Sequence, residues 1–284
     1  LKVPYDELLN IIISHSIKSQ ETEHAGGFWT DHWTYNLDLL ESYLGLYPER
    51  YKEIFFDKKT FTFYDNTEVV KPRLEKYILK DGRGRQLHAV AHDNTKEKLI
   101  RKRPSLAHVV RADYGHGEIY QTTLINKLFC LLVNKLASLD PFGIGIEMEA
   151  DKPNWFDALN GLPALFGSST CETFELKRLA LIIKDALEKS GVEKINISEE
   201  ILDFLNGLDG LISAYLNNGS SDKDYIFWDK SHSLKEKYRN KTKLGFSGKE
   251  AEIDSGRLQA MIANVLDKIN MGIDKALDKK NNVY

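Results

Sequence analysis

The stretch STCETFELKRLALIIKDALEKSG, residues 169–191, decides the fold class. It opens with a capping box, in which the Ser169 hydroxyl accepts a hydrogen bond from the Glu172 amide while the Glu172 side chain reaches back to the start of the helix. The helix that it opens runs to Ser190 and closes on Gly191, a residue favoured just past the last helical turn. This stretch therefore predicts a long helix with both of its ends marked in the sequence.

Helical signals also occur on both sides of this stretch. The second predicted helix ends before Pro48, and a predicted helix before the acidic loop ends at Asp140-Pro141. Together with a first helix between Pro4 and Ile17, the further predicted helices are Asn36–Tyr47, Ile119–Leu139, Ser198–Leu216, Asp222–Thr242 and Asp254–Lys279. These segments predict an all-α fold whose loops carry the functional site.

The segment at about 61–93 has a different character. Thr, Tyr, Val and Phe alternate with charged residues there, and Asp81-Gly82 is a strong signal for a two-residue hairpin turn. We expect a small β-hairpin insertion in the helical domain, with its many Lys and Arg side chains on a solvated face.

Composition limits the function classes. The chain has 284 residues, 29% of them charged, with a formal net charge of -3 and a pI near 6.3. This balance argues against nucleic acid as the main partner, because phosphate backbones are bound through excess Lys and Arg. No apolar run approaches the roughly 20 residues of a membrane span. We expect a cytoplasmic protein without a membrane partner, in which Cys130 and Cys171 are buried thiols.

The chain begins at Leu1, already inside a helical pattern, and we expect it to be part of a longer polypeptide.

Residues 26–38, GGFWTDHWTYNLD, interleave large aromatic residues with short polar ones, in a region that we expect to be a loop over residues 24–35. Sugar rings pack on aromatic planes, and their hydroxyl groups pair with carboxylate, amide and imidazole groups. The candidate substrate-binding residues are Trp29, Asp31, His32, Trp33, Tyr35 and Asp38. In a structural alternative to sugar binding, Trp29 and Trp33 pack into the core, and Asp31 or Asn36 caps the next helix. A metal site at His24, Asp31 and His32 matches no zinc spacing, so we expect none.

Residues 147–163, EMEADKPNWFDALNGLP, place carboxylates and a tryptophan between Gly and Pro residues. Cleavage of a glycosidic bond needs a carboxylic acid near an apolar surface that raises its pKa. Asp157 is the candidate catalytic acid, and Glu147, Glu149, Trp155 and Asn160 are candidate substrate-binding residues. Glu147 or Glu149 would act as a base, a hydroxyl ligand or an orienting group. The structural alternatives are a solvated acidic loop and an Asp157 that only caps a following helix.

Two of these stretches resemble glycoside hydrolase family 94, above all its 1,2-β-oligoglucan phosphorylase and cellobiose phosphorylase-like members. They are GFWTDHW, residues 27–33, and KPNWFDALNGLP, residues 152–163. Relatives carry an Ala-Asp-Trp-Asn-Asp motif whose last aspartate is the general acid, and the resemblance carries that role to Asp157. Asn154 and Phe156 depart from the motif, which affects subfamily and linkage more than the acid. The similarity spans most of Gly26 to Arg178.

The resemblance implies that residues 1–284 are part of an (α/α)6-barrel catalytic domain. It also implies inverting phosphorolysis of β-glucosidic bonds in oligoglucans, with inorganic phosphate as co-substrate, no other cofactor, and a sugar 1-phosphate as product. Asp157 would protonate the glycosidic oxygen while phosphate attacks the anomeric carbon, so a second catalytic carboxylate is not required. The phosphate-binding residues of the family follow the acid in sequence and would lie beyond Tyr284. Whether the full-length protein is a homodimer stays open.

Two other functions fit the same residues. One is an inverting hydrolase with Asp157 as acid and Glu147 or Glu149 as base, which needs no phosphate. The other is a non-catalytic domain that binds glycans through its aromatic loop.

Overall fold

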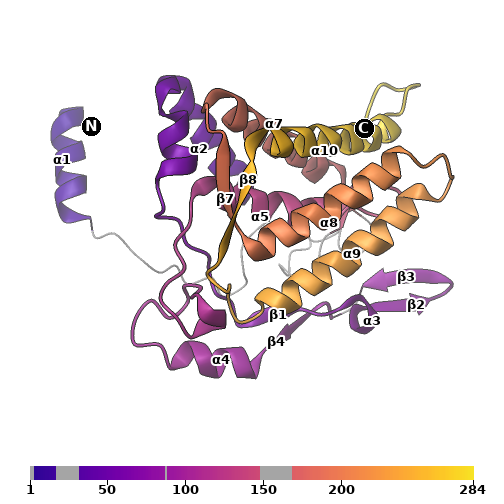
Figure 1. The fold of residues 1–284 in the computed structure, drawn as a ribbon, viewed down its shortest axis with the longest axis horizontal. Helices are drawn as coiled ribbons and strands as arrows, with labels where there is room; N and C mark the ends of the chain where they lie inside the picture. The colour runs from indigo at the N-terminus through magenta and orange to yellow at the C-terminus, as the bar shows by residue number, and fades with distance from the viewer. Residues whose placement is uncertain (1–2, 17–31, 87, 148–167) are drawn as a thin grey trace.

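The computed structural model describes residues 3–16, 32–86, 88–147 and 168–284 (Figure 1). The described chain is mainly helical, as predicted, with small two-stranded sheets. The helices are α1 (Tyr5–His15), α2 (His32–Leu46), α3 (Arg73–Lys76), α4 (Asn94–Arg101), α5 (Leu124–Leu136), α7 (Thr170–Lys189), α8 (Glu199–Leu216), α9 (Lys223–Thr242) and α10 (Ser255–Ala276), with the short helical turns η1 (Pro48–Arg50), η2 (Glu53–Asp57) and η3 (Asp113–Gly115). The strands are β1 (Glu68–Val70), β2 (Tyr77–Lys80), β3 (Arg83–Gln86), β4 (Val90–His92), β5 (Ile146–Glu147), β6 (Ser168–Ser169), β7 (Lys194–Ser198) and β8 (Glu250–Asp254).

The core lies between α5, α7, α8 and α10. Helix α10 packs along α7 and against α8, and α5 packs against both α7 and α8 (Figure 1). Fully buried side chains from each helix meet there, among them Phe129, Leu179, Leu208 and Ile262. Each such side chain contributes about 1.5–3 kcal/mol through the area that it removes from water. Helix α9 covers the outer side of α8.

Two helices are aligned by a strand pair that the sequence analysis did not predict. β7 leads directly into α8, and β8 leads directly into α10. The two strands pair antiparallel from Lys194 opposite Asp254 to Ser198 opposite Glu250. The Asp254 side chain accepts a hydrogen bond from the Arg257 amide at 3.0 Å and so caps α10. The register of this pair therefore fixes where both helices begin.

The predicted hairpin is present. β2 and β3 pair antiparallel, with Lys80 opposite Arg83 on either side of the turn. Asp81 has φ 53° and Gly82 has φ 71°. Positive φ at both central residues is typical of a type I′ turn, whose twist matches that of the flanking strands. A second antiparallel pair, β1 with β4, adjoins this hairpin in sequence.

Helix α7 follows the prediction except in the role of one side chain. Ser169 Oγ accepts from the Glu172 amide at 3.4 Å, and Gly191 has a positive φ of 66°. The predicted return bond from the Glu172 side chain is wrong, because that carboxylate accepts from Trp33 Nε1 and Lys135 Nζ instead. Cys171 in the first turn of α7 is exposed and Cys130 is only partly buried, so the prediction of two buried thiols is wrong.

Two predicted element boundaries are also wrong. Helix α2 begins at His32, so residues 32–35, predicted as loop, are helical. Helix α5 begins only at Leu124, because Ile119 and Thr122 form bridges with Arg111 and Phe61 and are held in extended conformation. Local helical spacing is outweighed there by pairing with distant segments. In the described part of the chain, no helix has the length and apolar content needed to cross a membrane.

The glycine-rich loop at residues 142–146 packs closely against α10. Gly143 has φ 67°, and a Cβ atom at Gly272 in α10 would lie 2.0 Å from the Gly143 carbonyl oxygen. A Cβ atom at Gly143 itself would lie 2.5 Å from both Asp224 Oδ1 and Lys268 Nζ. Both glycines are therefore required by the closeness of this contact.

Replacing Gly272 by Ala is expected to lower the free energy of unfolding by about 1–3 kcal/mol, because the added methyl group overpacks the contact with the loop. The matched control is Gly210→Ala in α8, where an added Cβ meets no atom within 4 Å. This control is expected to raise stability by about 0.5–1 kcal/mol, since alanine loses less backbone entropy in a helix. Urea unfolding monitored by circular dichroism compares the two variants, and equal effects would contradict the close contact.

Candidate functional site

Asp140 organises the loop that leads to Glu147. Its carboxylate accepts hydrogen bonds from the backbone amides of Phe142 (3.0 Å), Ile144 (2.9 Å) and Gly145 (3.0 Å). The Ser168 hydroxyl, from the other strand of the β5–β6 pair, also donates to it. The loop and the start of α7 are therefore tied to one buried carboxylate.

β5 places Glu147 beside the start of α7. Ile146 pairs with Ser169 and Glu147 with Ser168 in antiparallel register. Ile146 is buried in the core, and the Glu147 side chain is turned toward α9 and the hairpin, where it is 14% exposed. The segment that contains the predicted acid, Asp157, follows Glu147 directly in the sequence.

The Glu147 carboxylate receives donors from three aromatic side chains. Tyr77 Oη donates to Oε2 at 2.6 Å, and Trp228 Nε1 donates to Oε1 at 3.0 Å. His232 Nε2 lies 3.2 Å from Oε2. A carboxylate removed from water is stable only when such donors replace its hydration. These three rings therefore define the candidate site around Glu147.

The hairpin lies beside this site because Arg73, directly before its first strand, binds to α9. The Arg73 guanidinium donates to Asp229 (2.9 Å) and to Ser233 Oγ (2.8 Å), and its carbon lies 5.4 Å from the centre of the Trp228 ring. The Tyr77 ring, four residues on, meets Trp228 edge to face, with centroids 6.4 Å apart. The hairpin is thus one wall of the site.

A buried lysine completes the cluster. Lys235 is 2% exposed, and its Nζ donates to Ser138 Oγ at 2.9 Å. The Ser138 carbonyl oxygen accepts from the Glu147 amide at 2.7 Å. Ser138, at the end of α5, therefore links the backbone of Glu147 to a cation on α9.

The environment shifts two pKa values in this cluster. Burial raises the pKa of Glu147, but the hydrogen bond and charge of His232, the Tyr77 hydroxyl and the Lys235 charge outweigh burial, so that pKa lies below its ordinary value. Burial lowers the pKa of His232, as does the Lys235 charge, and Glu147 opposes them only in part. Each of the two shifts therefore depends on the protonation of the other member of the pair.

Neutral His232 cannot donate to both of its neighbours. Its Nδ1 lies 3.0 Å from the Trp228 carbonyl oxygen and its Nε2 faces the Glu147 carboxylate. Both neighbours only accept hydrogen bonds, and a neutral imidazole carries one N–H. Both contacts are hydrogen bonds only when each of the two ring nitrogens carries a proton. The protonation of His232 is therefore linked to that of Glu147.

Trp33 packs into the core, as predicted by the structural alternative to a sugar-binding role. Its side chain is 8% exposed and belongs to the core cluster. Its Nε1 donates to Glu172 Oε2 at 3.1 Å, and Lys135 Nζ lies 5.0 Å from the centre of its ring. Because Glu172 follows Ser168 by one turn, Trp33 and Glu147 lie at the same end of α7.

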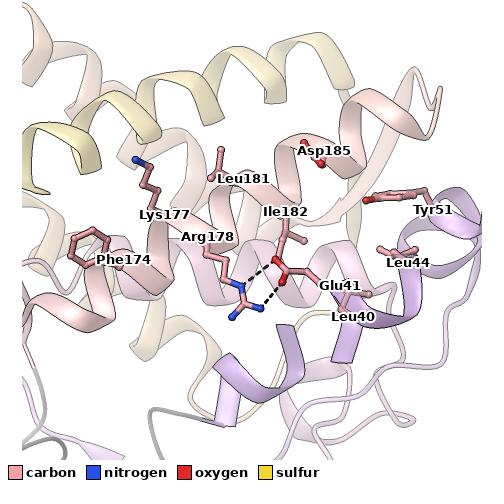
Figure 2. A pocket seen from close by; sticks show the side chains of 10 residues that line it. All are labelled: Leu40, Glu41, Leu44, Tyr51, Phe174, Lys177, Arg178, Leu181, Ile182 and Asp185. Atoms are coloured by element: carbon pink, nitrogen blue, oxygen red, sulfur yellow. Dashed lines mark hydrogen bonds and ion pairs between the residues drawn. The ribbon is translucent and has the colours of Figure 1, made fainter. Parts of the chain in front are cut away.

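The other two candidate residues of the aromatic stretch whose side chains are described, Tyr35 and Asp38, lie on the outside of α2. Tyr35 is 61% exposed. Asp38 accepts from Arg178 Nη2 at 2.5 Å, and the same guanidinium pairs with Glu41. Figure 2 shows Arg178 bonded to Glu41, and both residues line a pocket between α2 and α7. The volume of this pocket is about 440 Å³. In this structure Asp38 helps to join two helices.

The remaining predicted site residues fall outside the described part of the chain. They are Trp29, Asp31, Glu149, Trp155, Asp157 and Asn160, together with the side chain of His32. Among the residues that are described, no group of three His, Cys, Asp or Glu side chains is arranged to hold a metal ion.

The sequence analysis missed the partners of Glu147. Trp228, His232 and Lys235 are spaced i, i+4 and i+7, which places them on one face of α9. That spacing is the signal that could have identified them. Tyr77 had no such signal, because its position depends on how the hairpin packs against α9.

No family model matches this chain, and no curated protein is significantly similar to it.

The pH dependence of stability tests the surroundings of His232. Its pKa is lower in the folded chain than the unfolded value of about 6.5, so the unfolded chain binds more protons below that pH. The free energy of unfolding is therefore expected to fall as the pH is lowered through 6.5 toward 5, and His232→Gln is expected to reduce this fall.

His92 provides a control of opposite sign. Hydrogen bonds that its ring donates to Glu68 and Glu97 raise its pKa, so it stabilises the fold on the acid side and His92→Gln is expected to steepen the same fall. Urea unfolding at several pH values measures both slopes. An unchanged slope in His232→Gln would show that the imidazole is not buried as described.

Proposed function

We propose that this chain is part of the catalytic domain of a carbohydrate-active enzyme, and that it acts by inverting phosphorolysis of β-glucosidic bonds in oligoglucans. The observation that carries the proposal is the Glu147 carboxylate, which is held by Tyr77, Trp228 and His232 directly before the segment that contains Asp157. Aromatic rings around a fixed carboxylate are the groups that sugar recognition uses. The resemblance of residues 27–33 and 152–163 to glycoside hydrolase family 94 supports the same activity.

The chemical step needs one carboxylic acid. Asp157 donates its proton to the glycosidic oxygen as the bond to the anomeric carbon breaks, and a phosphate oxygen forms the new bond from the opposite face. The products are a sugar 1-phosphate of inverted configuration and an oligoglucan shortened by one unit. Asp157 is left ionised and regains a proton before the next cycle.

Glu147 fits an orienting role better than that of a base. Its Oε2 already faces two donor side chains, and its pKa is held below the ordinary value. A carboxylate with a low pKa and occupied lone pairs is a weak acceptor for the proton of an attacking water. This favours phosphorolysis, the alternative that requires no second catalytic carboxylate, over hydrolysis with Glu147 as base.

The fold that we propose for the whole domain is an (α/α)6 barrel to which these helices contribute. The packing of α5, α7, α8 and α10 around one apolar core supports helix-on-helix architecture, and the hairpin is an insertion at its edge.

The activity is tested by incubating the intact protein with β-linked glucose oligomers, with and without inorganic phosphate. A sugar 1-phosphate is expected only when phosphate is present. Asp157→Asn is expected to lower the rate by about 10²–10⁴-fold, since it removes the acid while keeping the shape of the side chain. Asp203→Asn, an exposed carboxylate on α8, is the matched control and should keep full activity.

Two other outcomes of this experiment would identify a hydrolase or a glycan-binding domain. Phosphate-independent release of glucose would identify a hydrolase. Glycan binding without any turnover, unaffected by Asp157→Asn, would identify a binding domain and contradict the proposal.

A further inference from the structure

A small pocket with positively charged walls lies between the end of α4 and the loop that contains η3. Its volume is about 350 Å³, at the lower end of the roughly 300–1,000 Å³ that small-molecule sites have. Its ionisable lining residues are Lys102 and Arg103, which follow α4, and Arg111 and His116, which flank η3. None of its described lining residues is Asp or Glu, so this space favours an anion.

The Arg103 guanidinium is buried at this pocket with only part of its donors used. Its side chain is 4% exposed, and its Nη1 donates to the carbonyl oxygens of Ala107 (2.7 Å) and Val109 (3.2 Å) and pairs with Asp65 at 2.8 Å. Its Nε and Nη2 have no hydrogen-bond acceptor in the described structure. A Cβ atom at Gly115, which also lines the pocket, would lie 3.5 Å from Nη2. Nη1 therefore faces Asp65, and Nη2 lies beside the pocket with unused donor capacity.

Arg111 places a second guanidinium beside the same space. Its Nη2 donates to the Ser105 carbonyl oxygen at 2.9 Å, and its Nε is a buried donor without an acceptor in the part of the chain that is described. A buried donor that lacks an acceptor costs free energy, because its hydration is lost without replacement. The two arginines have three such donor nitrogens, so a ligand with several acceptor oxygens would gain from binding here.

The carboxylates near the pocket do not balance its cations. Asp65 pairs with Arg103 and also with Lys96, at 2.6 Å, so its single charge is shared between two cations. Asp113 and Glu118 belong to the loop around η3, but both are exposed and neither lines the pocket. An excess of positive charge therefore remains at the pocket.

We propose that this pocket binds the phosphate group of a small anion, either inorganic phosphate or a phosphomonoester. The Nε and Nη2 of Arg103 and the Nε of Arg111 would donate to its oxygens, and the charge of Lys102 would add to the attraction. A phosphate group suits these donors better than a carboxylate does, because it offers more acceptor oxygens and up to two negative charges. Lys102 and His116 are exposed, so their side chains can move at the rim to admit the anion. This inference is independent of the proposed enzymatic function, because none of the pocket residues is a partner of Glu147.

The site is tested by isothermal titration of the intact protein with inorganic phosphate at low ionic strength. We expect saturable binding at one site, weakened about tenfold or more in Arg111→Gln, which removes charge-assisted hydrogen bonds. Arg101→Gln is the matched control, because it removes the same charge from a side chain that is 76% exposed on α4 outside the pocket. It should change the affinity by less than about twofold, since an exposed charge outside the site is screened. Circular dichroism and urea unfolding verify that both variants fold.

Lys102→Gln gives a second test that does not depend on a buried side chain. Lys102 is exposed, so its replacement keeps the fold. It is expected to weaken phosphate binding about two- to fivefold, which is the range of an exposed ion pair.

A second titration, with glucose 1-phosphate, identifies the source of the phosphate group. Binding tighter than that of inorganic phosphate, again weakened in Arg111→Gln, would identify a phosphomonoester, and equal or weaker binding would identify free phosphate. No saturable binding of either anion, or the same loss of affinity in Arg101→Gln as in Arg111→Gln, would overturn the proposal. Phosphate binding that Arg111→Gln leaves intact would also overturn it, since the anion would then occupy another site, such as the one that phosphorolysis requires.

Discussion

The partly buried carboxylate of Glu147 is the constraint on which the surrounding structure depends. A carboxylate with little exposure to water must be surrounded by donors, and no single element of this fold supplies enough of them. The hairpin contributes Tyr77, and α9 contributes Trp228 and His232. Satisfying one side chain therefore brings together elements that are far apart in sequence.

The same reasoning explains why the loop before Glu147 is so closely determined. Asp140 accepts three backbone amides, and Gly143 packs on Asp224, Lys268 and α10 without room for a Cβ atom. Lys268 is fully buried beside Asp224 and lies 4.3 Å from the centre of the Tyr215 ring. These polar contacts fix the position of a short strand that has few apolar contacts of its own. The apolar helices supply most of the stability, and the buried polar groups determine which arrangement of the loop is adopted.

The site and the core share one boundary, which is the start of α7. Ser168 binds Asp140, Ser169 caps the helix, and Glu172 holds Trp33 and Lys135. Trp33 is accordingly a core residue, and Glu147 is the predicted site residue whose carboxylate is held by three aromatic side chains.

The sequence by itself determined the four long helices after residue 169 and the hairpin turn, because capping residues, proline and glycine positions and apolar spacing act within a few residues of each other. It predicted α7, α8, α9 and α10 to within a few residues and placed the type I′ turn at Asp81-Gly82. It also singled out Glu147 from its place in an acidic stretch. Only the tertiary structure decided what surrounds Glu147, that Glu172 binds Trp33 and does not close a capping box, and that β7 pairs with β8. Those outcomes depend on contacts between residues tens of positions apart, whose energies arise only when the helices pack, so no local pattern records them.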